Sequence, residues 1–276
     1  MDNLTLSDIV FDCGQTAPPV SFGLPEGGSL AVIGDDDSLK SCFMKTISGI
    51  SRPAGGSLAV AGEPVSAAKQ AAGYVYDGWP LSLSLTLGDI DNIMKGIYAR
   101  WSTDRFYGFC FEFGLQKKKA IKELPVHMLR KLLLCIAMSH STRLLILNDP
   151  FSDADGGLDE DIVRVLRGFL KKNPKRSLVI SARQESAAAG LADHFLFLFK
   201  NSGAVFISKE EFAGDYVFSR CGVSDFARLD KNSVLFFNDN KEEVQFIIKK
   251  SAAPKNIKCS VPSAADAAAL MKGEKV

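Results

Sequence analysis

Short apolar runs bounded by glycine or charged residues alternate with segments of helical spacing along the first two thirds of the chain. Four of the runs have the length of a strand: residues 29–33, 57–60, 144–147 and 177–181. The last two are apolar almost throughout, which is typical of strands covered on both faces of a mostly parallel sheet. Residues 159–172 carry an apolar stripe at helical spacing, and residues 40–50 directly follow the first strong strand. The pattern predicts an α/β core.

Two further segments have a different pattern. Residues 81–138 are rich in aromatic side chains and read as several helices, so we expect a helical subdomain at about 81–140 inserted into a core domain of residues 1–208. The core is expected to end in a hairpin at 195–208, with its turn at 201–203. Residues 209–276 are expected to form a small C-terminal α+β extension with strands at 233–237 and 244–248. Its last helix has Ser263 as the expected N-cap and Gly273 as the expected stop.

Composition limits the functions that such a chain can serve. Charged residues make up 24% and the net charge is +1, so no global field favours nucleic acid and no nucleic-acid partner is expected. The longest apolar runs are far shorter than the roughly 20 residues of a membrane span. We therefore expect a soluble protein that another chain holds at any membrane where it acts. The six cysteines form no CxxC pair, which is typical of reduced thiols in a cytosolic protein, and the three histidines have no metal-ligand spacing.

The first strong strand leads into a degenerate phosphate-binding loop. The pattern G-x-x-x-x-G-K-[ST] has its first glycine, lysine and serine at Gly34, Lys40 and Ser41, whereas Leu39 replaces the second glycine. Such a loop binds phosphate through backbone N–H groups and the dipole of the following helix, and glycine permits the close approach. The expected nucleotide-binding positions are Gly34, Asp35, Asp36, Asp37, Ser38, Leu39, Lys40, Ser41 and Cys42.

Three consecutive carboxylates, those of Asp35, Asp36 and Asp37, surround this expected phosphate site. At roughly 6 Å and an effective dielectric constant of about 20, each like-charge pair costs on the order of 2–3 kcal/mol before screening. The sequence therefore predicts a loop that rejects polyphosphate through charge and through the bulk of Leu39. The alternative is a polar turn between strand and helix with aspartates as caps.

Further segments flank this loop in a fixed order: residues 24–27, 48–56, 73–77, 124–128, 144–150, 152–155 and 178–183. In order and spacing they resemble the turn before the P-loop, the segment after it, the Q-loop, the signature motif, Walker B, the D-loop and the switch strand of ABC transporter ATP-binding subunits. The resemblance covers residues 1 to about 208, and the tail resembles the extension of ATPases that serve ABC-2-type exporters. It implies a P-loop NTPase (ABC ATPase-like) fold, ATP and Mg²⁺ as cofactors, and two partners: a membrane subunit and a second ATP-binding subunit in a homo- or heterodimer.

The residues at the family's catalytic positions depart from the pattern. Asn148, which the resemblance would place on Mg²⁺ beside Ser41, is a neutral amide rather than an aspartate. Asp149 stands where the family has its catalytic glutamate and is one methylene shorter. Arg183 replaces the switch histidine and cannot shuttle a proton, and Asp77 replaces the Q-loop glutamine. The alternatives are a polar strand end at residues 148–149 and a salt bridge at Arg183.

The signature motif is degenerate as well. Its positions are Leu124, Pro125, Val126, His127 and Met128. Pro125 replaces the serine and offers neither a hydroxyl nor an N–H, while His127 replaces a glycine and is expected to be an exposed cap residue rather than a ligand. Phe11 has two readings, as the aromatic that stacks on adenine or as a core residue.

These departures predict a degenerate ABC ATP-binding subunit, a pseudo-ATPase with hydrolysis impaired or lost, that acts in assembly or regulation of a membrane export complex. It would be cytoplasmic and peripheral on the inner face of the membrane through a membrane partner. Two alternatives stay open: an active ABC ATPase that powers export with weak turnover, and a free-standing cytosolic binding protein. Exposed aromatic side chains within residues 98–113 would favour docking to a membrane partner.

Overall fold

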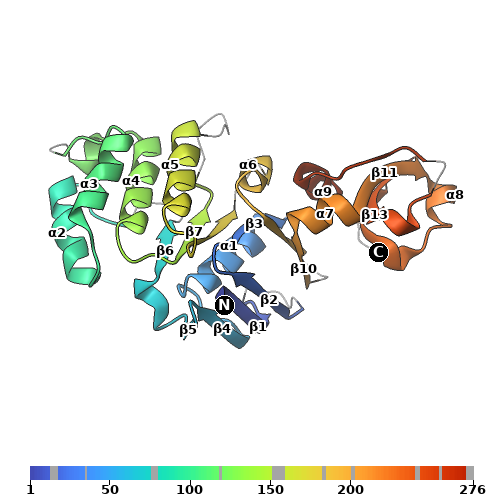
Figure 1. The fold of residues 1–276 in the computed structure, drawn as a ribbon, viewed down its shortest axis with the longest axis horizontal. Helices are drawn as coiled ribbons and strands as arrows, with labels where there is room; N and C mark the ends of the chain where they lie inside the picture. The colour runs from blue at the N-terminus through green and yellow to red at the C-terminus, as the bar shows by residue number, and fades with distance from the viewer. Residues whose placement is uncertain are drawn as a thin grey trace.

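A six-stranded sheet forms the centre of the chain, in the order β10–β9–β3–β8–β7–β6 (Figure 1). The computed structural model describes residues 1–12, 18–34, 36–75, 80–117, 120–150, 159–181, 185–199, 203–239, 243–254 and 257–271. The strands are β3 Ser29–Gly34, β6 Ala72–Val75, β7 Leu144–Asn148, β8 Ser177–Ser181, β9 His194–Phe199 and β10 Gly203–Ser208. All neighbours pair in parallel except β10, which runs antiparallel to β9 as the predicted hairpin requires. The α/β core predicted from the apolar runs is confirmed.

Successive side chains of the central strands point to opposite faces of the sheet and pack into two different hydrophobic clusters. Leu30 and Val32 of β3 lie in one cluster, with helix α1 Asp37–Ile47, and Ala31 and Ile33 lie in the other. The second cluster also holds α5 Glu160–Lys171 and the five-residue helix α6 Glu185–Ala189. Alternation of this kind places every residue of β3 and β8 in the interior, because both faces of the sheet are covered.

A second, antiparallel sheet covers the α1 face, in the order β2–β1–β4–β5. Its strands are β1 Asp2–Val10, β2 Val20–Pro25, β4 Gly55–Val60 and β5 Glu63–Pro64, with the short helix η1 Ala68–Gln70 after them. Sequence reasoning identified β4 but missed β1 and β2. Gly56 has a φ of +85°, and a Cβ there would lie 2.3 Å from the Asp8 carbonyl oxygen, so close pairing of β4 with β1 requires glycine.

The predicted helical subdomain consists of α2 Leu87–Ile97, α3 Thr103–Glu112, η2 Ile121–Glu123 and α4 Val126–Met138, gathered at one end of the molecule (Figure 1). Three of its aromatic side chains, Phe106, Phe109 and Phe113, are buried, and Tyr98, Trp101 and Tyr107 are half-buried against the same cluster. Phe111 is the exception at 86% exposure. The inward-facing rings hold the helices together, so they give no support for docking.

The C-terminal residues build a third sheet at the other end of the molecule, in the order β12–β13–β11–β14 (Figure 1). Its elements are α7 Lys209–Asp215, β11 Tyr216–Gly222, α8 Val223–Phe226, η3 Lys231–Ser233, β12 Val234–Asp239, β13 Glu243–Lys249, η4 Lys250–Ala252, β14 Cys259–Ser260 and α9 Ala264–Met271. Both predicted strands are present, whereas β11 was missed. Ser263 forms the predicted capping box, accepting from Asp266 N at 3.1 Å and donating its own N–H to the Asp266 carboxylate at 2.8 Å. Gly273 lies outside the described residues.

Aromatic packing joins this extension to the central sheet. The Phe236 ring lies 4.8 Å from Phe197 and 5.4 Å from Phe199 of β9, and Phe212 lies 5.4 Å from Phe197. These residues and α9 belong to the same buried cluster as α4 and α5. The extension and the core therefore share one hydrophobic interior.

The cysteines correct one expectation. Cys110, Cys135, Cys221 and Cys259 are free thiols, but Cys42 is disulfide-bonded. The prediction of reduced thiols throughout was wrong at Cys42, because sequence spacing carries no information on which cysteines approach each other in space.

Candidate functional site

The predicted phosphate loop lies between β3 and α1, where backbone segments approach closely. A Cβ on Gly34 would lie 3.0 Å from the Leu198 carbonyl oxygen of β9 and 3.4 Å from the Lys40 Cγ. Glycine therefore lets β3 end tightly against its neighbour and leaves room for the lysine stem. Asp35 lies outside the described residues.

Asp36 caps the helix that would otherwise receive phosphate. Its backbone is extended, with a φ of −111° and a ψ of 108°, and its Oδ1 accepts from Ser38 N at 2.8 Å and from Leu39 N at 3.1 Å. Its carbonyl oxygen also accepts the Lys40 N–H at 3.1 Å. Free N–H groups at a helix N-terminus are the usual binding site for an anion. Here the anion at the helix N-terminus is the carboxylate of Asp36 itself. For this residue, the alternative prediction of a turn capped by aspartate is confirmed.

Lys40 is held by a second acid of the same loop. The Lys40 ammonium lies 2.9 Å from the Asp37 carboxylate; the lysine side chain is 7% exposed and the aspartate side chain 81%. The pair is therefore a buried cation with a solvent-facing partner. Ser38 is exposed, and Ser41 and Cys42 on α1 are half-buried.

Leu39 does not fill the phosphate position. Its side chain is 7% exposed and belongs to the buried cluster with Phe11 and Phe43, whose rings meet edge to face at 5.5 Å. The prediction that its isobutyl group blocks the loop was wrong, because the helical phase of α1 turns residues 39 and 43 to the core. Phe11 is likewise a core residue and is not presented to a ligand.

At the carboxyl end of β7, the expected metal and catalytic positions follow one another. Asn148 is half-buried and pairs in register with Ser181 of β8. Asp149 has a φ of +50°, a left-handed conformation that aspartate tolerates better than most residues. Its N–H donates to the Ser181 carbonyl at 2.7 Å, and its own carbonyl accepts from Arg130 of α4.

Only some of the remaining residues predicted to act in catalysis or metal binding lie in the part of the chain that the structure describes. The part of the chain that the structure describes holds no cluster of three or more His, Cys, Asp or Glu side chains suited to a metal ion. A joint role for Ser41 and Asn148 on Mg²⁺ stays a prediction. The predicted positions Asp77 and Arg183, and the stretch at 152–155, lie outside the described residues.

The signature positions form the start of α4. Pro125 is its N-cap and makes no side-chain capping hydrogen bond, while its carbonyl accepts from Met128 N at 2.9 Å. Leu124 and Met128 are half-buried, whereas Val126 and His127 are exposed. His127 is thus exposed at the helix start, as predicted. Of the first residues of α4, none presents a hydroxyl to this helix terminus.

A groove of about 370 Å³, which sequence reasoning missed, lies between the core and the helical subdomain. The helical side is formed by Met94, Ile97, Tyr98, Leu133 and Ile136, and the core side by Ser48, Gly49, Ile50, Lys69, Ala72 and Tyr74, with Pro80 and Leu81 beside them. Ile50 and Ile97 are exposed. The lining is mostly apolar, and its single charged side chain is Lys69. No local signal marks the groove, because its residues come from segments nearly 90 positions apart.

Gln70 and His140 hold residues that line this groove in position. The Gln70 amide donates to the Ile97 carbonyl at 3.0 Å and accepts from Ala99 N at 3.1 Å, which fixes the end of α2 against η1. The His140 ring stacks on Tyr98 at 4.0 Å, and its Nδ1 lies 3.2 Å from the Gln70 carbonyl oxygen. Burial lowers the pKa of His140 from 6.5 to about 4, so the ring is neutral near pH 7.

Comparison with known proteins shows which proteins this chain is similar to. A family model described as ABC transporter matches residues 18–152, which include the loop, the start of α4 and the end of β7. Over these residues, just under half of its length, the chain is similar to ABC transporter ATP-binding proteins. Its lantibiotic transport ATP-binding relative SrtF from Streptococcus pyogenes is 25% identical over 197 residues, covering 69% of this chain and 82% of that protein.

Other ABC relatives extend the comparison. The Fe(3+) ions import ATP-binding protein FbpC 3 from Rhodococcus jostii (strain RHA1) is 25% identical over 178 residues, covering 61% of this chain and 51% of that protein. The solved structure of an ATP binding subunit of an ABC transporter has a TM-score of 0.66 at 19% identity, covering 76% of this chain and 91% of that one. The fold is thus that of an ABC ATPase. Within the part of the chain that the structure describes, no helix is both long enough and apolar enough to cross a membrane.

Proposed function

We propose that this chain is a pseudo-ATPase of the ABC family, in which carboxylates of its own loop take the place of bound phosphate. The observation that carries the proposal is the double occupation of the loop: Asp36 accepts from the first amides of α1, and Asp37 pairs with Lys40. Those amides and that ammonium are the groups with which a P-loop holds phosphate.

The arrangement does not fit Mg-ATP. A polyphosphate would have to displace one carboxylate from two amides and a second from Lys40, and both displaced acids would stay beside it. At roughly 6 Å, each such repulsion costs on the order of 2–3 kcal/mol. On the metal side, Asn148 offers a neutral amide where charge neutralisation of Mg²⁺ calls for a carboxylate.

The hydrolytic positions support the same conclusion. The Asp149 backbone is held in a left-handed conformation by Ser181 and Arg130, and its carboxylate extends one methylene less far from that backbone than a glutamate would. Pro125 brings no hydroxyl and no N–H to the start of α4. A subunit of this kind contributes to a transporter through binding rather than turnover.

The groove supports the second half of the proposal, a role in the assembly or regulation of a membrane export complex. Its apolar walls, with exposed Ile50 and Ile97 and the single cation Lys69, fit a short amphipathic helix that carries an acidic side chain. We assign this occupant to the membrane subunit. Export as the direction of transport rests on the resemblance of the C-terminal extension, since relatives of both import and lantibiotic transport are similar to the chain.

Calorimetric titration with Mg-ATP tests the proposal. The wild-type chain is expected to give no saturable binding below millimolar nucleotide. Asp36→Gly/Asp37→Gly frees the amides and Lys40, and is expected to tighten binding at least tenfold; the glycine cap itself costs only a few tenths of a kcal/mol.

The matched control is Asp36→Asn/Asp37→Asn, which removes the same two charges but keeps a capping oxygen on the amides. It is expected to gain less than the glycine pair. Micromolar binding by the wild-type chain would instead favour the alternative of an active ATPase. Gly34, Lys40 and Ser41, which the chain retains from the P-loop pattern, are consistent with that alternative.

A further inference from the structure

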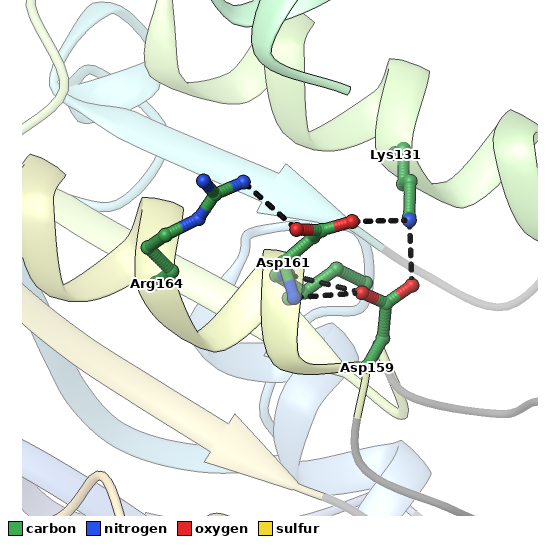
Figure 2. A network of polar contacts seen from close by, with 5 residues as sticks. Lys131, Asp159, Asp161 and Arg164 are labelled. Carbon is green, nitrogen blue, oxygen red and sulfur yellow. Dashed lines mark hydrogen bonds and ion pairs between the residues drawn. The ribbon is translucent and has the colours of Figure 1, made fainter. Parts of the chain in front are cut away.

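Two consecutive residues of α4 hold the two elements that follow it in the sequence. Arg130 donates to the Asp149 carbonyl at the end of β7. Lys131 reaches the Asp159 carboxylate, at 2.7 Å, and the Asp161 carboxylate, at 3.7 Å, at the start of α5. Figure 2 shows the Lys131 ammonium between these two acids, with Arg164 on the far side of Asp161 at 2.8 Å.

The centre of this network is shielded from solvent. The Lys131 side chain is 9% exposed and the Asp159 side chain 14%, and the ammonium lies 5.6 Å from the centre of the Phe113 ring. Asp159 is also the N-cap of α5, accepting from Asp161 N at 3.0 Å and from Ile162 N at 3.2 Å. Because the cap and the ion pair share one carboxylate, a movement of α4 away from α5 would strand a buried charge.

Lys131 lies opposite the groove. Leu133, two residues further on, lines the groove, and two residues turn an α-helix through about 200°. One face of α4 is therefore the wall of the groove while the other is fixed to α5 and β7. The position of α4 sets the width of the groove, because Leu133 and Ile136 face the core side across it.

We propose that the Arg130–Lys131 pair clamps α4 to the core and so keeps the groove at one fixed width without nucleotide. This inference rests on the proposed function in one respect, namely that the groove is the docking site. The clamp is a positioning device: Lys131 and Asp159 contact no occupant, but determine where the helical wall stands.

Distance measurements between two spin labels test the clamp in the full-length chain. The labels are placed on His127 at the exposed start of α4 and on Glu63 in β5, after replacement of the exposed Cys259 by serine. Double electron–electron resonance is expected to give one narrow distance distribution, unchanged by Mg-ATP. The variant Asp159→Asn/Asp161→Asn keeps an oxygen at the cap but leaves Lys131 without a carboxylate, and is expected to broaden the distribution at least twofold.

Two further variants complete the design. Lys131→Met, which keeps an unbranched stem against Phe113, is expected to broaden the distribution in the same way. Arg164→Met removes the exposed outer ion pair only, and is expected to leave the distribution narrow. A narrow, unshifted distribution in both Lys131→Met and the double variant would overturn the clamp. A shift of the wild-type distribution by Mg-ATP would contradict the proposed function instead, so the two failures are distinguishable.

Discussion

The ammonium of Lys40 lies 2.9 Å from the carboxylate of Asp37, three residues before it on the first turn of α1. In a P-loop that binds nucleotide, the same lysine reaches the phosphates. A double-mutant cycle with Asp37→Asn and Lys40→Met measures the strength of the pair by urea unfolding. Because Asp37 faces solvent, we expect a coupling free energy of about 0.5 kcal/mol. A cycle that closes with no coupling would mean that Lys40 is not held by Asp37.

Replacement of Leu39 distinguishes a core position from a blocked binding loop. Leu39→Ala is expected to lower the free energy of unfolding by about 2–4 kcal/mol, because the side chain is buried beside Phe43. The control Ser38→Ala, at the exposed neighbouring position, should change it by less than about 0.5 kcal/mol. If urea denaturation shows that Leu39→Ala leaves the free energy of unfolding unchanged, Leu39 would not be a core residue and its side chain would instead lie in the phosphate loop.

The buried His140 makes stability depend on pH. Its pKa is about 4 in the folded chain and 6.5 in the unfolded chain, so unfolding takes up a proton between these values. The free energy of unfolding is therefore expected to fall as the pH drops from 6.5 to 4, by about 2–3 kcal/mol from this group. Urea unfolding of His140→Gln should lack this part of the slope, whereas His127→Gln, at an exposed position, should keep it.

Phe236 tests whether the extension and the core form one folding unit. Phe236→Ala is expected to cost about 3–5 kcal/mol, since its ring packs on Phe197 and Phe199 of the central sheet. Phe111→Ala removes a ring that is 86% exposed and should cost less than about 0.5 kcal/mol. Calorimetry should show one transition for both variants. Two separate transitions in the wild-type chain would contradict a shared interior.

The fold was predictable where periodicity carries the information. The apolar runs at 29–33, 144–147 and 177–181 fall within β3, β7 and β8, and the helical stripe at 159–172 matches α5. β1 and β2 were missed because polar residues interrupt them, and because their pairing joins positions that are distant from each other. In the loop, the aspartates were noticed, but which of them caps the helix depends on backbone angles that the sequence does not display.

The groove and the clamp lay beyond sequence reasoning for a different reason. Lys131 precedes an apolar run, and nothing near it in the chain indicates that its partner is Asp159, 28 positions later. Such contacts depend on the packing of α4 against α5. Leu39, by contrast, could have been placed correctly, since residues 39, 43 and 47 are apolar at helical spacing and all three are buried.

A carboxylate that belongs to the chain cannot diffuse away. Asp36 faces the α1 amides at a local concentration fixed by the covalent backbone, whereas a free nucleotide must compete from millimolar solution. The conformation of this loop would therefore be the same at low and at high cellular ATP concentration. If the proposed pseudo-ATPase role holds, a transporter that incorporates the subunit would receive from it a structural contact that does not vary with the ATP concentration.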